Sequence, residues 1–389
     1  MRIADVLQTS RDAAFALGRE CAAWKPSAER ALLGVNAMLS VLLSVALAHM
    51  LHLADTWWVA ISGFAVMQTH FAASLERALH RVLGTIIGAL LGALVGPLIG
   101  AQPWFFIPVV GVIGGFTVYR ANTGSASYAW VLGGVTAIMV TYEAHQLLAF
   151  RATASFALLR VIDVCVGVSA CVAVSGALRL GQQWYRRHRP AQETASAAGV
   201  AGVAGVAGVA AQANQFSVES MRLTYAEAAV QAGFAIAICA AFAYMLKLPT
   251  LAQALVTIIA VLILPPSGIA DLNKPIAVKM VQRIIGCLLA GAIGVALLPL
   301  LHGREIPCLV ALSAGVWVGC HVQTGARGAS YIGRQFTIAF IMVFVQDKGW
   351  SGDPGMAMSR LAGIVGGIVI LAAVMLVANR LLFRSRVSI

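Results

Sequence analysis

Charged residues are scarce in this sequence. Only 11% of its 389 residues are Asp, Glu, Lys or Arg, against about 25% in soluble globular proteins. Hydrophobic residues make up 60% of the chain, and the mean hydropathy is +0.86. This composition excludes an ordinary soluble domain. It predicts a membrane protein whose main partner is the lipid bilayer.

Acidic residues are rarer than basic ones, and the formal net charge is +12. The sequence has no basic stripe with interleaved aromatic residues, so the positive charge does not indicate nucleic-acid binding. The lysines and arginines lie mostly in the connections between apolar segments. That distribution is typical of the cytoplasmic loops of a membrane protein.

Motifs of enzymatic chemistry are also missing. The sequence contains no P-loop, no GxGxxG, no HExxH and no GxSxG, and its seven cysteines form no CxxC pair. We therefore expect no enzyme activity, no catalytic residue, no metal site, no disulfide framework and no cofactor.

Long apolar segments are what the chain does have. A spanning helix needs about 20 apolar residues, and six candidates in each half approach this length. They cover residues 32–53, 56–70, 82–100, 104–119, 128–142 and 153–178, then 226–246, 249–264, 284–301, 306–320, 332–345 and 361–382. The sequence thus predicts an all-α polytopic membrane protein with about 12 transmembrane helices, several of them short.

The two halves look like copies of one another. Residues recur about 200 positions apart, as in the pairs Arg77 and Lys279, Arg81 and Arg283, Gly84 and Gly286, and Arg160 and Arg360. An even number of spans in each half predicts two parallel six-helix repeats, related by a pseudo-twofold axis along the membrane normal. We expect an interfacial cytoplasmic helix at 1–30, repeats at 31–180 and 223–383, a cytoplasmic Gly/Val/Ala-rich linker at 181–222, and a basic cytoplasmic tail at 384–389.

Glycines recur at every fourth position of the third apolar segment and, less regularly, of its copy. They are Gly84, Gly88, Gly92 and Gly96 in the first half and Gly286 and Gly294 in the second. Since lipid provides no hydrophobic drive for helix association, such small faces predict close helix packing. A sharper hypothesis places this seam at the repeat interface, beside a transport path.

Four arginines lie in or at the ends of apolar segments. Arg81 and Arg283 either anchor their helices at the interface by snorkelling or form an inward-facing cationic pair. Arg160 has Asp163 three residues on, the spacing of an ion pair on one helix face. Arg360 has no acid within one turn, so it needs a partner elsewhere: backbone, lipid, another helix or a substrate carboxylate.

Polar and aromatic residues also gather after the fourth apolar segment of each half. The first copy offers Arg120 and Tyr128; the second offers His321, Gln323, Tyr331 and Arg334. They fit either an aromatic anion site or a basic loop with an aromatic belt. Trp58, in the short second segment, is a further candidate for lining a binding site. Candidates for a titrating group that couples transport to protons are Asp163, Glu143 and His321.

The arrangement resembles the fusaric acid resistance protein family, which includes aromatic acid exporters, and is distantly similar to plant aluminium-activated malate transporters. The residues that carry the resemblance are Arg81-Val-Leu-Gly84-Thr85, Arg283-Ile-Ile-Gly286, Arg160-Val-Ile-Asp163, and Arg360 leading to Gly367. The resemblance implies export of small aromatic or other organic anions across the bacterial inner membrane, often with a periplasmic adaptor protein as partner.

These observations lead us to expect an exporter of small organic anions that is coupled to protons. An anion channel with a basic pore is the first alternative. A membrane scaffold that transports no solute is the second.

The distribution of basic residues generates a topological prediction. Both termini and the run Arg186–Arg189 should be cytoplasmic, since the opposite-side loops hold only Arg151, Lys247, Arg304 and Lys348 of the 27 lysines and arginines. A reporter that is active only in the periplasm should stay inactive when it is fused after Ile389. Activity of that fusion would contradict the predicted orientation.

Overall fold

The computed structural model describes residues 3–24, 27–188, 218–246, 251–263, 273–346 and 349–387. The core of the predicted linker, Lys247, Lys348 and Ile389 lie outside these residues. The described chain forms helices and no strand, which confirms the all-helical prediction. In order they are α1 (Ile3–Ala22), α2 (Ala28–Met50), α3 (Thr56–Ala65), α4 (Phe71–Ile99), α5 (Pro103–Thr123), α6 (Ser127–Leu147), α7 (Phe150–His188), α8 (Val218–Leu246), α9 (Leu251–Leu262), α10 (Asn273–Leu301), α11 (Glu305–Gln323), α12 (Ser330–Phe344) and α13 (Gly355–Val387).

Some predicted boundaries need correction. Helix α7 continues to His188 and α8 begins at Val218, so helix extends into both ends of the segment 181–222 that was expected to be linker. Helix α13 likewise runs to Val387, into the expected tail. Residues 182–188 contain neither Gly nor Pro, so nothing in their backbone chemistry stops the helix where the apolar run stops.

Eight of the described helices are long and apolar enough to cross a membrane: α2, α4, α5, α7, α8, α10, α11 and α13. Helices α9 and α12 are apolar but shorter, and α3 has only 10 residues, all of them buried. Of the twelve or so expected spans, eight helices therefore have the length and composition of a transmembrane helix.

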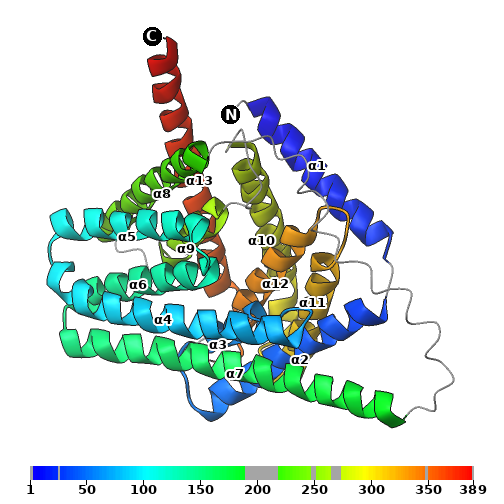
Figure 1. Cartoon of the computed structure of the whole chain (residues 1–389). Helices are drawn as coiled ribbons and strands as arrows, with labels where there is room; N and C mark the ends of the chain where they lie inside the picture. The colour runs from blue at the N-terminus through cyan, green and yellow to red at the C-terminus, as the bar shows by residue number, and fades with distance from the viewer. Residues whose placement is uncertain are drawn as a thin grey trace.

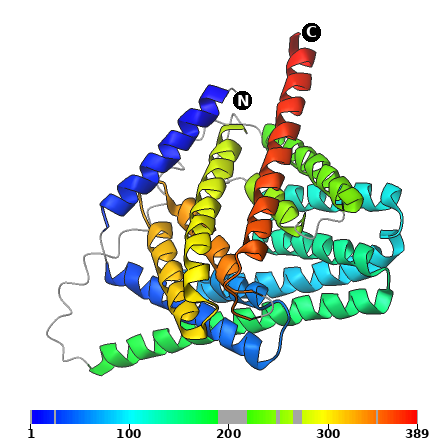
Figure 2. The same cartoon turned by 180° about the vertical axis from the view of Figure 1, so that it is seen from behind.

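Helix packing follows the same plan in the two halves. Helix α2 contacts α3 and α7 while α4 contacts α6 and α7; correspondingly, α8 contacts α9 and α13 while α10 contacts α12 and α13. Between the halves, α5 packs on α8 and α11 packs on α2. Figure 1 shows α4, α5, α6 and α7 running across the view, with α10 and α13 crosswise to them, and Figure 2 shows α10 and α13 from behind.

Helix α4 has two opposite faces. Its glycine face lies against α6: a Cβ atom added at Gly92 would be 2.6 Å from Val140 Cβ, and one at Gly96 would be 2.6 Å from Ala144 Cβ. Its other face exposes large apolar side chains, namely Leu79, Leu83, Ile87, Leu90, Leu94 and Leu98. Small residues inside and large apolar residues outside are what a helix in lipid needs, because close backbone contact, not burial of leucine, drives its association.

The other glycines of the predicted seams have similar surroundings. Added Cβ atoms at Gly84 and Gly88 would clash with backbone carbonyl groups of α6, and those at Gly286 and Gly294 would clash with α12. Both seams thus lie inside their own half. The sharper hypothesis of a glycine seam between the halves is wrong for these residues.

We predict that Gly92→Leu destabilises the protein by about 3 kcal/mol or prevents its assembly, because the side chain must enter an already filled crossing. Gly366→Leu is the matched control, since nothing lies within 4 Å of a Cβ atom at that glycine of α13. Thermal unfolding in detergent measures the difference. Equal melting temperatures for the two variants would show that the α4–α6 contact is not close-packed.

Candidate anion-binding site

Arg81 lies inside the helical bundle and joins three helices of the first half. Its side chain is 3% exposed. Nη1 donates to the Tyr128 hydroxyl of α6 at 2.8 Å, and Nη2 donates to Ser62 Oγ of α3 at 3.0 Å. A buried guanidinium that is bonded on two sides is not snorkelling to an interface, so the anchoring interpretation is wrong for Arg81.

Arg283 repeats this arrangement in the second half. It is 6% exposed, and it donates from Nη1 to Gln335 Oε1 of α12 at 2.6 Å and from Nη2 to Thr257 Oγ1 of α9 at 3.1 Å. In both halves the arginine is held by a hydroxyl on the short helix, α3 or α9, and by a polar side chain on α6 or α12. Snorkelling is excluded for Arg283 as well.

Further arginines surround Arg81. The Arg77 guanidinium lies over the Tyr128 ring, 4.2 Å from its centroid. Arg334, on α12 of the second half, interacts electrostatically with Arg77, Arg81 and Tyr128 and also with Tyr331. Elements of both halves therefore meet in one cluster of cations and phenols, which we call the arginine–tyrosine cluster (Arg77, Arg81, Arg334, Tyr128 and Tyr331).

The cluster lacks balancing negative charge. Within the described residues, no aspartate or glutamate forms an ion pair with any of its three arginines. Several of its buried donors also have no hydrogen-bond partner there, namely Arg77 Nε, Arg81 Nε and the Tyr331 hydroxyl. Buried polar groups without partners are costly. The arrangement is therefore chemically suited to accept an anion with several oxygen atoms.

Arg160 sits between two carboxylates. Its guanidinium pairs with Asp163 of its own helix at 3.2 Å and also contacts Asp55, directly before α3. The rings of Phe156 and Trp58 lie 5.0 and 5.8 Å from it. Arg160 and Asp163 are almost fully buried, whereas the Asp55 side chain is 29% exposed. The expected pair is present, and Asp55 turns it into a triad.

Arg360 has protein partners in the second half and across the interface. Nη1 donates to the Met342 carbonyl oxygen at 3.0 Å and to that of Val345 at 3.5 Å, at the end of α12. Its guanidinium also lies 4.6 Å from the centroid of the Trp57 ring of α3. A cation at a helix C-terminus satisfies carbonyl groups that lack intrahelical partners. This geometry favours the structural interpretation of Arg360.

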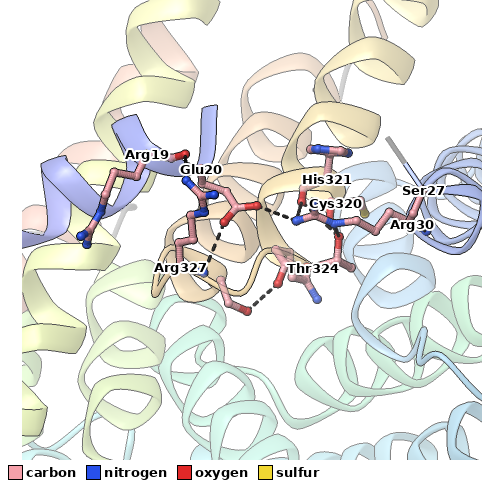
Figure 3. Close-up of polar contacts among 10 residues, drawn as sticks. Arg19, Glu20, Ser27, Arg30, Cys320, His321, Thr324 and Arg327 are labelled. Carbon is pink, nitrogen blue, oxygen red and sulfur yellow. Dashed lines mark hydrogen bonds and ion pairs between the residues drawn. The ribbon is translucent and has the colours of Figure 1, made fainter. Parts of the chain in front are cut away.

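His321 lies elsewhere, near the end of the N-terminal helix (Figure 3). The His321 ring stacks on Trp24 at 3.8 Å. Nearby, Arg30 donates to Glu20 at 2.6 Å and to Thr324 Oγ1 at 3.1 Å. The backbone carbonyl of Gln323 accepts from Ser330 Oγ. The end of α1 docks onto the α11–α12 connection through Glu20 and the Arg19 carbonyl, which accept from the backbone N–H and the guanidinium of Arg327.

The remaining candidates are also apart from the arginine–tyrosine cluster. The Arg120 guanidinium lies 4.8 Å from the Trp130 ring centroid, the basic-loop arrangement weighed above. Glu143 is half-buried on α6 and forms no ion pair within the described residues. The predicted gathering of polar residues from both fourth segments thus splits, and only Tyr128, Tyr331 and Arg334 come together.

A part of the chain that contributes to this site matches a known protein family. Residues 43–174 match the family model described as fusaric acid resistance protein-like. The chain therefore contains a fusaric acid resistance protein-like domain. This confirms the resemblance drawn from the sequence. No curated protein and no solved structure matches the chain.

The fusaric acid resistance protein-like domain covers α3 to α6, the C-terminal third of α2 and most of α7. It includes Arg81, Tyr128 and the Asp55–Arg160–Asp163 triad. Arg334 and Tyr331 lie outside the matched residues, so the arginine–tyrosine cluster is completed by the second half.

Sequence reasoning missed the polar partners on the short helices. Ser62, Thr257 and Asp55 are single polar residues in or beside apolar runs. The sequence carries no clear signal for the first two, because a hydroxyl inside a helix can bond the carbonyl one turn back, as Ser62 does to Trp58 and Thr257 does to Gln253.

We predict that Arg160→Gln lowers the free energy of unfolding by about 3 kcal/mol, because two carboxylates then lose their shared cation. Adding Asp163→Asn should restore part of the loss. Arg151→Gln, exposed on the same helix, should have little effect. Melting temperatures measure all three, and an Arg160→Gln variant as stable as Arg151→Gln would show that the triad contributes nothing.

Proposed function

We propose that this protein exports small organic anions, with aromatic carboxylates as the main class, across the bacterial inner membrane. The observation that carries the proposal is the arginine–tyrosine cluster between the two halves, with its three cations and, among the described residues, no paired acid. The match of residues 43–174 to a fusaric acid resistance protein-like domain supports a transport role.

Physical chemistry favours a carboxylate at this cluster. A guanidinium presents planar donors that suit two carboxylate oxygens. Three arginines near one another repel, so an anion that enters between them relieves part of that repulsion. The Tyr128 and Tyr331 rings offer aromatic surface for a solute that carries its own ring.

The repeated packing plan supports transport through two parallel six-helix repeats. Helices α3, α6, α9 and α12 complete the twelve when they are added to the eight long apolar helices. Because the cluster takes residues from both repeats, movement of one repeat against the other would change its access from one side of the membrane to the other. Both termini are cytoplasmic in this proposal, and a periplasmic adaptor protein would receive the solute.

Proton coupling fits the Asp55–Arg160–Asp163 triad best among the titratable groups considered. Two carboxylates share one guanidinium there, so one proton can be taken up without leaving the arginine unpaired. Asp55 is the more exposed acid and would exchange protons with water, whereas Asp163 is buried.

An anion channel remains the competing function, since a cationic cluster between two halves would also attract permeating anions. Voltage-clamp recording separates the two: currents that follow the anion gradient without saturation favour the channel. The scaffold alternative is less suited to the unbalanced positive charge, because a purely structural core gains nothing from it.

We predict that Tyr331→Phe weakens benzoate binding about fivefold, the effect of one lost hydrogen bond. Its melting temperature should be unchanged or higher, because the removed hydroxyl is buried and has no partner among the described residues. Titration calorimetry and thermal unfolding of the purified protein measure the two quantities.

Tyr128→Phe provides the contrast, since its hydroxyl accepts from Arg81; this variant should lose both stability and affinity. Tyr185→Phe, at an exposed position of α7, should bind benzoate with unchanged affinity. Normal benzoate affinity in Tyr331→Phe would remove this hydroxyl from the binding site. Absence of binding by the unmodified protein to benzoate and other organic acids would favour the scaffold.

A further inference from the structure

A polar cavity of about 390 Å³ lies between α2, α7 and the start of α4. Its lining includes Glu29 and Asn36 from α2, His70 at the start of α4, and Ser175 and Arg179 from α7. Asn36 and Ser175 hydrogen-bond to each other across it at 3.1 Å. The cavity thus has one cation, one acid and several neutral polar groups.

An apolar groove of about 530 Å³ follows the same two helices, further from the N-terminus of α2. It is lined only by Leu39, Leu42, Leu43, Ala46, Val174, Ala177 and Leu178. Leu178 lines the polar cavity as well, so the two hollows adjoin along the contact between α2 and α7. Together they form one elongated hollow that is polar at one end and apolar at the other, which we call the α2–α7 groove.

We propose that the α2–α7 groove binds a phospholipid with a zwitterionic headgroup that carries a primary amine. The phosphate lies at Arg179, the ammonium group lies at Glu29, and one acyl chain lies between α2 and α7. The site is separate from the arginine–tyrosine cluster, and the proposal does not depend on the transport function.

The charges decide the class of headgroup. A guanidinium binds phosphate oxygens through several donors, and Arg179 is braced by the Phe71 ring, 5.4 Å from its guanidinium carbon. A headgroup with negative charge alone would face the Glu29 carboxylate as well. A lipid that lacks phosphate would leave Arg179 without an anionic partner. Only a headgroup with both charges complements both residues, and a primary ammonium, unlike the quaternary ammonium of choline, also donates hydrogen bonds to the Glu29 carboxylate.

The position agrees with a lipid of the leaflet that contacts the N-terminal end of α2. Arg179 and Glu29 are exposed, as charged groups at headgroup depth should be. The apolar part is lined by exposed Leu39 and by Ala46, seven residues further along α2, or about 10 Å at the helical rise. A bound lipid would fill the seam between α2 and α7 and stabilise it.

The first test measures lipid retention. The purified protein is delipidated, mixed with phosphatidylethanolamine, phosphatidylglycerol or phosphatidylcholine, and analysed by native mass spectrometry. We expect phosphatidylethanolamine to be retained most. Arg179→Gln should lower its occupancy about tenfold, whereas Arg187→Gln, exposed two turns further along α7 and outside the lining, should leave it unchanged.

The second test separates headgroup from chain. Glu29→Gln should abolish the preference for phosphatidylethanolamine over phosphatidylglycerol. Ala177→Trp should fill the apolar groove and lower retention of both lipids, whereas Ala173→Trp, also exposed on α7 but outside the lining, should not. Retention that favours phosphatidylglycerol, or that is equal in Arg179→Gln, Ala177→Trp and their controls, would overturn the proposal.

Discussion

A guanidinium held inside an apolar helical bundle must find its hydrogen-bond partners within the protein, because the surrounding hydrocarbon offers none. Among the described residues, four arginines are in that position: Arg81, Arg160, Arg283 and Arg360. Each is held by groups from more than one structural element. The arginines therefore act as cross-links, and three of them converge on the short buried helix α3 and the residue before it, through Ser62, Trp57 and Asp55.

The close approach of α4 to α6 allows Arg81 to form its hydrogen bond to α6. Arg81 reaches Tyr128 because Gly84 and Gly88, one and two turns further along α4, let the α6 backbone come near. Larger residues at these glycines would push α6 away and separate the hydrogen-bonding groups. The glycine seam and the buried arginine are thus coupled, because the glycines set the α4–α6 distance that the arginine hydrogen bond requires. The same holds for Gly286 and Arg283 against α12.

The sequence was sufficient for helices, glycine faces and the Arg160–Asp163 pair, because these depend on neighbours along one helix. It was insufficient wherever a contact joins distant segments. Asp55 and Trp57 approach the arginines of α7 and α13 only through packing, and no spacing rule connects them. For His321 the prediction failed in the opposite way: its repeat position suggested the anion site, yet Trp24, just after α1, stacks on its ring.

The departures from repeat symmetry are as informative as the symmetry. Arg160 is held by two titratable carboxylates, whereas its counterpart Arg360 is held by carbonyl oxygens at the end of α12, which cannot take up a proton. A change of protonation would therefore act on the first repeat alone. Arg360 also contacts Trp57, and Arg160 contacts Trp58. Both arginines therefore pack against α3. A shift of α3 caused by protonation in one repeat would reach the other repeat directly, and through Ser62 it would also reach Arg81 in the arginine–tyrosine cluster.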